Sequence, residues 1–313
     1  MTLDTLVERY IALQQALGKS YVSTAKLLRA FVRSVGPDVA ARAVTRAQVD
    51  AYLMPKGPLT RNYHSKYNAL RGFFRYAQRH GQFDSIPLPA VVAKQPPPFQ
   101  PYIYSLEELR RLLAAIDLPR RSRTDVEPIT LRTVVFLQYG AGLRISEVLA
   151  LDHSDVDLER SLLTVRNSKS FRSRLVPVGA TLGRVLSDYA RRPSRLPVPR
   201  QPSFITTRDG ERAKSRAMQG YFRRICERAG IRRRDGSRLQ PRLHDLRHTF
   251  AVHRLTSWYR EGADVQTLLS HLCVYLGHTC LAATQVYLSM TPELLAEAGA
   301  RFGRYAGTGG GHG

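Results

Sequence analysis

Apolar residues recur every three or four positions through the first 85 residues, which is the spacing of one buried face of a helix. Thr45 is predicted to cap a short third helix, because its hydroxyl can accept a hydrogen bond from the first helical turn. The pattern therefore predicts a helical first domain. Its first two helices place their apolar residues at Leu3, Leu6, Val7, Tyr10, Leu13, Ala25, Leu28, Phe31 and Val32.

A fourth helix is predicted from residues 60 to 80, with Gly81 ending it. One face of this helix is apolar, with Tyr67, Leu70, Phe73, Phe74 and Ala77. The other face is basic, and phosphate contacts are preferred there over an ordinary solvated surface. The candidate phosphate-binding residues on this face are Arg61, Asn62, Lys66, Arg71 and Arg75.

Residues 86–103 are dense in proline, which removes backbone donors and blocks helix formation, so an extended linker is predicted. Ser105 and Glu108 then form a capping box that begins a second domain. The C-terminal sequence GTGGGHG has little to bury and is predicted to be disordered. The predicted division of the chain is a helical first domain at 1–85, a proline-rich linker at 86–103, a second domain at 104–305 and a disordered tail at 306–313.

The second domain combines helices with a small amount of β-structure. A buried helix is predicted to end at Gly140, a new helix to start near Arg144, and an amphipathic helix to follow near residues 217–230. A β-hairpin is predicted from residues 161–169 and 174–178, a short strand and turn from 201–210, and a last helix from 291–302 with Pro292 in its first turn. The predicted fold class is mainly α with a small β-sheet or hairpin, in which a helical first domain precedes an α+β second domain.

The net charge of the chain indicates which class of molecule it binds. Lysine and arginine number 48 against 25 acidic residues, a formal net charge of +23. A polyanion would relieve this self-repulsion, and neutralising phosphates releases counterions. Because the basic residues are spread along the chain, nucleic acid is preferred as the partner over a solvated basic surface or an acidic membrane. No apolar run reaches the roughly 18 residues of a membrane helix, and the acidic, amphipathic sequence MTLDTLVERY argues against a secretory signal. A cytoplasmic protein associated with the nucleoid is therefore predicted.

The cysteines predict neither disulfides nor a metal site. Cys226, Cys273 and Cys280 form no CxxC pair and are interpreted as reduced thiols. His271, Cys273, His278 and Cys280 alternate as zinc ligands sometimes do, but their spacing matches none of the common zinc patterns. The segment HLCVYLGH is more typical of a helix that ends at a glycine.

Arg144, in GLRISE, is the first candidate for chemistry. It follows a glycine break at the start of a helix, where the helix dipole disfavours a cation. A bound anion would explain an arginine there. A salt bridge to Glu147, three residues on, is the alternative.

Two further motifs carry candidate residues. His244 and Arg247, in HDLRH, lie three apart and share a helix face, with a structural histidine and a surface arginine as the alternative. His278 follows the glycine of LGH, and Tyr287 stands nine residues later. A core or interface tyrosine is the alternative for Tyr287, because the chain has 15 tyrosines.

Taken together and in order, these motifs resemble those of a known family. GLRISE, the basic hairpin NSKSFRSRLVP, HDLRH, and LGH with a tyrosine nine residues on are similar to the motifs of the tyrosine recombinases, which include phage integrases, Xer-type chromosome recombinases and many transposon recombinases. The resemblance covers residues 105–303. It implies a SAM-like core-binding domain, then a catalytic domain that breaks and rejoins DNA.

The resemblance implies how the scissile phosphate is bound and attacked. Arg144 and Arg247 would hold its non-bridging oxygens, because a guanidinium offers paired donors and stays charged. His278 would donate to the same oxygens. Tyr287 would attack in line, leaving a 3′-phosphotyrosyl link and a free 5′-hydroxyl. The link conserves the phosphoester energy and fixed cations stabilise the developing charge, so no cofactor, nucleotide or metal is expected.

The remaining roles that the resemblance implies concern protons and the DNA backbone. Lys169 would protonate the departing 5′-oxygen, and His244 would assist near the tyrosine as proton acceptor or hydrogen-bond partner. Arg172 and Arg174 on the hairpin, together with Arg242, are candidate DNA contacts.

The resemblance also implies an assembly of four protomers on two DNA sites, exchanging strands through a Holliday junction. The helix after Tyr287, with Leu294 and Leu295, would dock on a neighbouring protomer or pack on its own domain. The stretch between Arg247 and His278 is several residues longer than in Xer-like members, which favours a recombinase of mobile elements. The need for a second recombinase or a DNA-bending protein is left open.

Three alternatives differ in kind from a recombinase. A type IB topoisomerase-like enzyme would use the same tyrosine chemistry as a monomer, without exchanging DNA partners. A DNA-binding regulator that has lost catalysis would have no need of Tyr287 or Lys169. An RNA-binding module would be expected to show stacked aromatic motifs, and the sequence has none.

Overall fold

The computed structural model divides the chain into two compact units, residues 1–99 and 100–313. It describes residues 1–54, 57–95, 100–118, 125–166, 173–192, 202–237, 239–290, 292 and 294–300. Within these ranges no helix is both long enough and apolar enough to cross a membrane.

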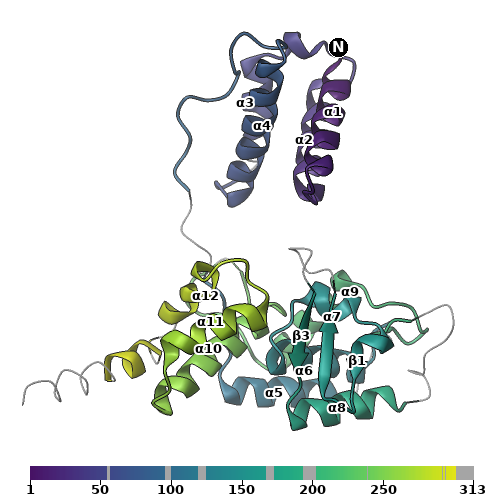
Figure 1. Ribbon diagram of the computed structural model, residues 1–313, viewed down its shortest axis with the longest axis vertical. Coiled ribbons are helices and arrows are strands. Elements are labelled where there is room, and N and C mark those ends of the chain that lie inside the picture. Colours follow the sequence, from purple (N-terminus) through teal and green to yellow (C-terminus); the bar gives the residue numbers. More distant parts are fainter. Residues whose placement is uncertain are drawn as a thin grey trace, which may run out of the picture. The chain divides into compact units, whose positions relative to one another are not determined.

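The first unit is a bundle of helices (Figure 1). The predicted cap at Thr45 is confirmed, since its hydroxyl accepts from the Gln48 amide while the Gln48 side chain accepts from the Thr45 amide. All four predicted helices of this region are confirmed. Their bounds are α1 Leu3–Ala16, α2 Val22–Val35, α3 Arg46–Leu53 and α4 Arg61–Arg79, with a short 3-10 turn at Ala41–Ala43.

The core of the first unit is built on aromatic rings. Phe31, Phe73 and Phe74 are fully buried, and the Phe31 and Phe74 rings meet edge to face with centroids 6.0 Å apart. Because α4 turns Phe73, Phe74 and Ala77 into this core, its other side is left to the polar residues of the helix.

The segment that joins α4 to the second unit has no helix or strand in its described residues, 80–95 and 100–105. Leu88 is buried in the core of the first unit, and Tyr104 is buried in the core of the second. Both ends of the predicted linker, 86–103, are therefore held by packing.

The second unit begins where Ser105 and Glu108 form the predicted capping box at the start of α5. Figure 1 shows α10, α11 and α12 together at one side of this unit, with the strands toward the other side. Its elements are α5 Leu106–Asp117, α6 Pro128–Gly140, α7 Ile145–Ala150, a 3-10 turn His153–Asp155, β1 Val156–Asp157, β2 Leu162–Val165, β3 Arg174–Pro177, α8 Ala180–Ala190, α9 Ser215–Arg228, α10 Asp245–Arg260, α11 Val265–Leu276, α12 Ala282–Gln285 and η4 Val286–Ser289.

The β-structure is a small antiparallel sheet in the order β1-β2-β3. Its β2–β3 hairpin is the predicted one, with Leu163 opposite Val176 and Val165 opposite Arg174. Residues 167–172, which connect these strands, lie outside the described residues. The predicted fold class, mainly helical with a small sheet, is confirmed. The sequence pattern did not identify β1 or α8.

Two predictions need adjustment. In place of a short strand near residues 201–210, the structure has only isolated bridges from Ser203 to Asp152 and from Thr206 to Arg212. The last predicted helix is present at residues 294–300, where Leu294 is buried and Leu295 is 52% exposed. Thr291 and the predicted disordered tail, 306–313, lie outside the described residues.

Candidate active site

The first turn of α10 carries three of the residues that form the site. Asp245, fully buried, accepts hydrogen bonds from the Arg242 amide at 2.9 Å and from Arg242 Nη2 at 2.8 Å, which fixes the start of the helix. His244, Arg247 and His248 therefore project from one rigid turn.

Glu147 binds arginines from two different elements. Its carboxylate accepts from Nη1 of Arg144 at 2.7 Å, and from Nη1 and Nη2 of Arg174 at 3.1 and 2.9 Å. Nη1 of Arg247 lies 3.8 Å from the same carboxylate. The salt bridge between Arg144 and Glu147, which the sequence offered as the alternative to an anion site, is thus one part of a larger cluster.

The same arginines bind the carboxyl end of α11, where backbone carbonyls have no partner within the helix. Nε of Arg174 donates to the Tyr275 carbonyl at 2.9 Å, Nη2 of Arg247 to the Leu276 carbonyl at 2.6 Å, and Nη2 of Arg144 to the Gly277 carbonyl at 2.9 Å. Cations are favoured at this end of a helix dipole. These hydrogen bonds fix the turn that leads into His278.

Gly277 makes this close approach possible. Its backbone is left-handed, with φ +65°, and a Cβ atom there would lie 2.7 Å from Nη1 of Arg174. The predicted glycine end of this helix is confirmed, and it has a second reason in the space that Arg174 occupies.

The cluster remains positively charged at neutral pH. Burial and neighbouring arginines lower the pKa of Arg247 to about 10, which still leaves it protonated. Burial would raise the pKa of Glu147, but hydrogen bonds from Arg174 and Arg144 outweigh it and lower that pKa to about 2. Three guanidiniums and one carboxylate give a formal charge of +2 (3 − 1), which suits an anion.

Tyr287 lies beside this cluster. It sits in η4, is 2% exposed, and packs in the same apolar cluster as Leu294. Its hydroxyl lies 3.1 Å from Nδ1 of His248, and its ring is stacked on the ring of His278 with centroids 6.0 Å apart. Burial raises the pKa of Tyr287, while the positive charges of Arg247 and Arg144 oppose the rise.

The histidines of the site are neutral at physiological pH. Burial, followed by the nearby positive charges, lowers the pKa of His248 to about 3 and that of His278 to about 4, and it also lowers the pKa of His244. Nδ1 of His278 lies 2.8 Å from the hydroxyl of Thr284, which is fully buried. Thr284 therefore fixes the orientation of the His278 ring.

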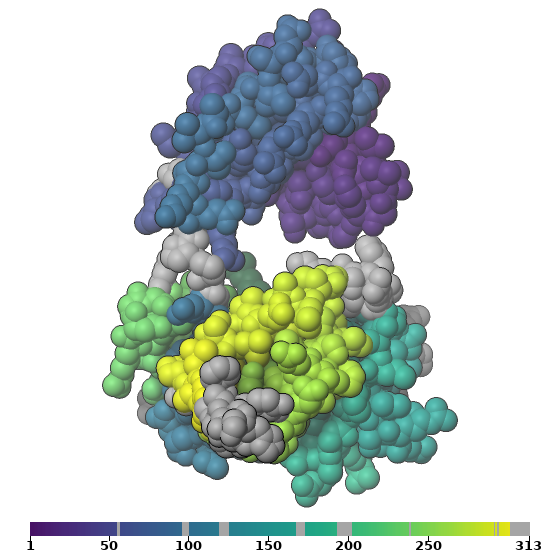
Figure 2. All heavy atoms as spheres, turned by 60° about the vertical axis from the view of Figure 1, so that its left-hand side comes forward, coloured from purple at the N-terminus to yellow at the C-terminus, as the bar shows by residue number. Residues whose placement is uncertain are grey.

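Five of the six predicted catalytic residues are brought together. Arg144, His244, Arg247, His278 and Tyr287 come from the starts of α7 and α10, from the turn after α11 and from η4, and they gather around the carboxyl end of α11. Figure 2 shows the segments after α10, coloured yellow-green to yellow, gathered together on the face of the second unit that is in view. Lys169 lies outside the described residues.

The predicted DNA-binding residues on α4 have different environments. Arg61, Asn62, Arg71 and Arg75 are exposed. The ammonium group of Lys66 instead donates to the Tyr52 carbonyl at 2.7 Å and lies 4.2 Å from the centre of the Tyr52 ring. Burial lowers the pKa of Lys66.

In the second unit, the candidate DNA contacts also separate. Arg172 lies outside the described residues, and Arg242 is held by Asp245. The side chain of Arg174 is 11% exposed, and its hydrogen bonds go to Glu147 and the Tyr275 carbonyl. In this structure Arg174 thus belongs to the arginine cluster rather than to an open surface.

Two residues of the site, Glu147 and His248, were not predicted from the sequence as site residues. Glu147 was considered only as a partner of Arg144, yet its spacing does not show that it also binds Arg174. His248 stands four residues after His244 in HDLRH, which places both on one helix face. That spacing was the available signal for His248.

In the part of the chain that the structure describes, no group of three or more His, Cys, Asp or Glu side chains could hold a metal ion.

Comparison with known proteins decides the family. The model of the phage integrase family matches residues 104–293. The chain belongs to this family. A putative integrase/recombinase of Sinorhizobium fredii, y4rE, is 36% identical over 306 residues, covering 96% of this chain and 95% of that protein. The tyrosine recombinase XerA of Thermococcus kodakarensis is 32% identical over 248 residues, covering 79% and 77%.

Solved structures support the fold of this phage integrase family member. The integrase of transposon Tn1549, in complex with a circular intermediate DNA, has a TM-score of 0.68 at 16% identity and covers 97% of this chain and 99% of that chain. A lambda integrase tetramer bound to a Holliday junction has a TM-score of 0.62 at 16% identity, covering 92% and 77%. The predicted family is confirmed, and the protein is a site-specific tyrosine recombinase that breaks and rejoins DNA.

Proposed function

We propose that Tyr287 is the nucleophile of this recombinase and forms a 3′-phosphotyrosyl link with DNA. The proposal rests on the position of its hydroxyl beside a largely buried cluster of three arginines and Glu147, which has a formal charge of +2. A tyrosine placed only for packing would not need so costly a neighbour, because burying cations without an anion is unfavourable.

Arg144 and Arg247 are proposed to bind the non-bridging oxygens of the scissile phosphate. A guanidinium has five N–H groups. Arg144 uses two of them for Glu147 and Gly277. Arg247 uses two for the carbonyls of Gly142 and Leu276 and is also hydrogen-bonded to Tyr287. Both side chains are therefore fixed by the protein and still have donors for a phosphate. Preorganised donors of this kind stabilise charge that develops in the transition state.

His278 is proposed to donate to the same phosphate through Nε2. When the Thr284 hydroxyl donates to Nδ1, the proton of the neutral ring is left on Nε2. The low pKa of His278 supports the neutral form.

Two proton-handling roles complete the proposal. Lys169 protonates the departing 5′-oxygen, and His244 assists near the tyrosine, where its ring meets the ring of His248 edge to face at 4.9 Å. No nucleotide, cofactor or metal enters these steps, because the covalent link retains the phosphoester energy and the arginines supply the positive charge.

The first unit is proposed to act as a core-binding domain, residues 1–85, joined by the linker 86–103 to the catalytic domain, 104–305. Its contacts with the DNA backbone would come from the exposed arginines of α4. Arg172 and Arg242 are proposed as further contacts from the second unit. The protein is proposed to act in the cytoplasm, at the nucleoid.

Four protomers on two sites are proposed to exchange strands through a Holliday junction. Support comes from the lambda integrase tetramer on such a junction, which shares the fold. Similarity to an integrase/recombinase and to a transposon integrase supports a mobile-element role. The burial of Leu294 favours packing of residues 294–300 on their own unit, and Leu295 is left exposed for a neighbour.

A suicide substrate tests the nucleophile directly. Purified protein is incubated without divalent metal with nicked duplexes from the flanks of its own gene, beside Tyr287→Phe. We expect a denaturation-resistant protein–DNA adduct that the variant does not form. Tyr139→Phe, which removes a tyrosine hydroxyl bonded to His253 in the same unit, is the matched control and is expected to keep the adduct.

A plasmid assay with the same purified protein separates recombination from topoisomerase-like activity. With two sites on one plasmid, a recombinase yields products with exchanged flanks and Holliday-junction intermediates. Relaxed plasmid without exchanged products would indicate the topoisomerase alternative. Adduct formation by Tyr287→Phe would show that another residue is the nucleophile.

A further inference from the structure

The Tyr287 hydroxyl is hydrogen-bonded to Arg247 and lies beside one histidine, which is not the histidine that the family resemblance indicated. Nδ1 of His248 lies 3.1 Å from the Tyr287 hydroxyl, and the two rings are 5.6 Å apart. His244 stands one turn earlier, immediately before α10, and its ring meets the ring of His248 edge to face at 4.9 Å. The group best placed to act on the nucleophile is therefore His248.

We propose that Nδ1 of His248 holds the Tyr287 hydroxyl and accepts its proton during attack on DNA. This inference rests on the proposed function, in which Tyr287 is the nucleophile. In the step, the bond from Tyr287 Oη to phosphorus forms and the bond from phosphorus to the 5′-oxygen breaks. The tyrosine proton moves to Nδ1, and the 5′-oxygen takes its proton from the proposed general acid, Lys169. Religation reverses both transfers.

The surroundings of His248 suit an acceptor. A base must be unprotonated before the reaction, and the low pKa of His248 ensures this at physiological pH. The charged and titratable groups that face it come from the start of α10, from the end of α11 and from η4, and they are Arg242, His244, Arg247, His278 and Tyr287. A bound phosphate adds negative charge to this group and so favours protonation of the imidazole as the reaction proceeds.

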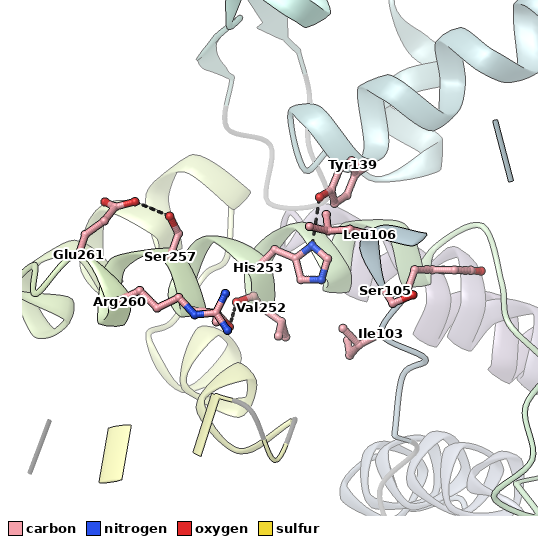
Figure 3. A pocket seen from close by; sticks show the side chains of 11 residues that line it. Ile103, Ser105, Leu106, Tyr139, Val252, His253, Ser257, Arg260 and Glu261 are labelled. Carbon is pink, nitrogen blue, oxygen red and sulfur yellow. Dashed lines mark hydrogen bonds between the residues drawn. The ribbon is translucent and has the colours of Figure 1, made fainter. Parts of the chain in front are cut away.

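A second histidine–tyrosine pair on the same helix provides a matched control. Nδ1 of His253 lies 3.0 Å from the hydroxyl of Tyr139, in a pocket between α6 and α10 (Figure 3). The two pairs have the same donor and acceptor types and nearly the same length. Only the Tyr287 pair adjoins the arginine cluster, so a change in His253 should leave cleavage intact.

The hydrogen bond is tested first in the free protein, where no DNA is needed. Full-length protein labelled with ¹⁵N-histidine is compared with Tyr287→Phe and with Tyr139→Phe. We expect Tyr287→Phe to shift the ring-nitrogen resonances of His248 and Tyr139→Phe to shift those of His253. Unchanged His248 resonances in Tyr287→Phe would overturn the proposal whether or not the protein cleaves DNA.

Proton transfer is then tested with His248→Asn, whose side chain puts a polar atom near the position of Nδ1 but is not basic. Adduct formation on the suicide substrate is measured against pH, with His253→Asn as control. We expect the His248→Asn rate to fall by roughly 100-fold at neutral pH, within the usual range for general acid–base catalysis. Its rate should rise tenfold per pH unit as tyrosinate forms, while the wild-type rate stays level.

Added imidazole should partly restore His248→Ala but not Tyr287→Phe. A folding defect would lower cleavage without changing the pH profile, and thermal unfolding of each variant checks for it. If His248→Asn formed the adduct at the wild-type rate, proton transfer from Tyr287 to His248 would be overturned. The same conclusion would follow if the pH profile of adduct formation changed in His244→Asn and not in His248→Asn. Absence of a Tyr287-dependent adduct in the wild type, with the His248 shift present, would instead contradict the proposed function.

Discussion

Glu147 shows how one carboxylate can organise a site made of cations. It joins Arg144 at the start of α7 to Arg174 on β3, and both also bind the end of α11. Its ionised form is therefore needed to hold the arginines that are proposed to bind the phosphate. Removing one member of such a buried group leaves the others without a counter-charge.

This predicts an acid-dependent stability. The pKa of Glu147 falls from 4.5 to about 2 on folding, so its contribution is fully present above pH 4.5 and is lost as the pH falls toward 2. Glu147→Gln should cost about 3 kcal/mol at neutral pH and flatten the loss of stability between these pH values. Urea unfolding at several pH values measures both effects.

Asp117→Asn is the control for this prediction, because Asp117 forms an exposed ion pair with Arg132. It should change the free energy of unfolding by less than about 1 kcal/mol. An equal effect of the two substitutions would contradict the special role of Glu147.

His248 gives a second pH dependence at the residue scale. Its folded pKa, about 3, is below the ordinary value of 6.5, so the unfolded chain takes up its proton first as the pH falls. Stability should therefore fall by up to about 1.4 kcal/mol per pH unit below pH 6.5 through this residue. His248→Asn should remove that part of the slope, as measured by thermal or urea unfolding from neutral pH to about pH 4.5. An unchanged slope would show that the imidazole is not buried as described.

At the scale of elements, the carboxyl end of α11 connects the helices and the strand that carry the three arginines of the site. Three backbone carbonyls there are bound by three arginines, and Gly277 gives the left-handed turn that they require. Any side chain at this position displaces Arg174. Stability and the geometry of the site are thus coupled at one residue.

Gly277→Ala should therefore lower both stability and cleavage. Left-handed backbone costs a non-glycine residue about 1–2 kcal/mol, and the contact with Arg174 adds to it. Gly262→Ala is the matched control, because its φ is +72° and nothing lies within 4 Å of the added Cβ. It should lose stability by a similar backbone term and keep its rate of adduct formation. Equal cleavage by both variants would contradict the claim that Gly277 couples stability to the geometry of the site.

At the scale of the whole molecule, the net charge of +23 sets the behaviour toward DNA. Each phosphate contact releases counterions, so the logarithm of the DNA association constant should fall linearly with the logarithm of the salt concentration. The exposed arginines of α4 should account for part of that slope.

Replacement of Arg71 and Arg75 together by alanine should reduce the slope by up to about 2, as measured by fluorescence anisotropy over a salt series. The control removes the same charge by Arg29→Ala with Arg46→Ala. Those arginines are paired with Glu8 and Asp50. A smaller change is expected for the control pair, and equal changes would mean that α4 makes no specific backbone contacts.

Local signals in the sequence were sufficient for most of the fold. Helical periodicity and caps such as Thr45 and Ser105 act within a few residues, so they fix where helices begin whatever the rest of the chain does. Strand β1 has only two residues, too few for an alternating pattern to appear. The stretch at 201–210 has strand-like composition, but its position against Asp152 leaves it only isolated bridges.

The sequence by itself determined the family and the basic character, and it predicted Arg144, Arg247, His278 and Tyr287 as site residues, because ordered motifs and charge are properties of the chain. Only the tertiary structure decided which histidine meets the tyrosine hydroxyl and where Arg174 points. Those contacts join α10 to η4 and β3 to α7, and their lengths depend on how separate elements pack. No pattern along the chain encodes a distance between elements brought together by folding.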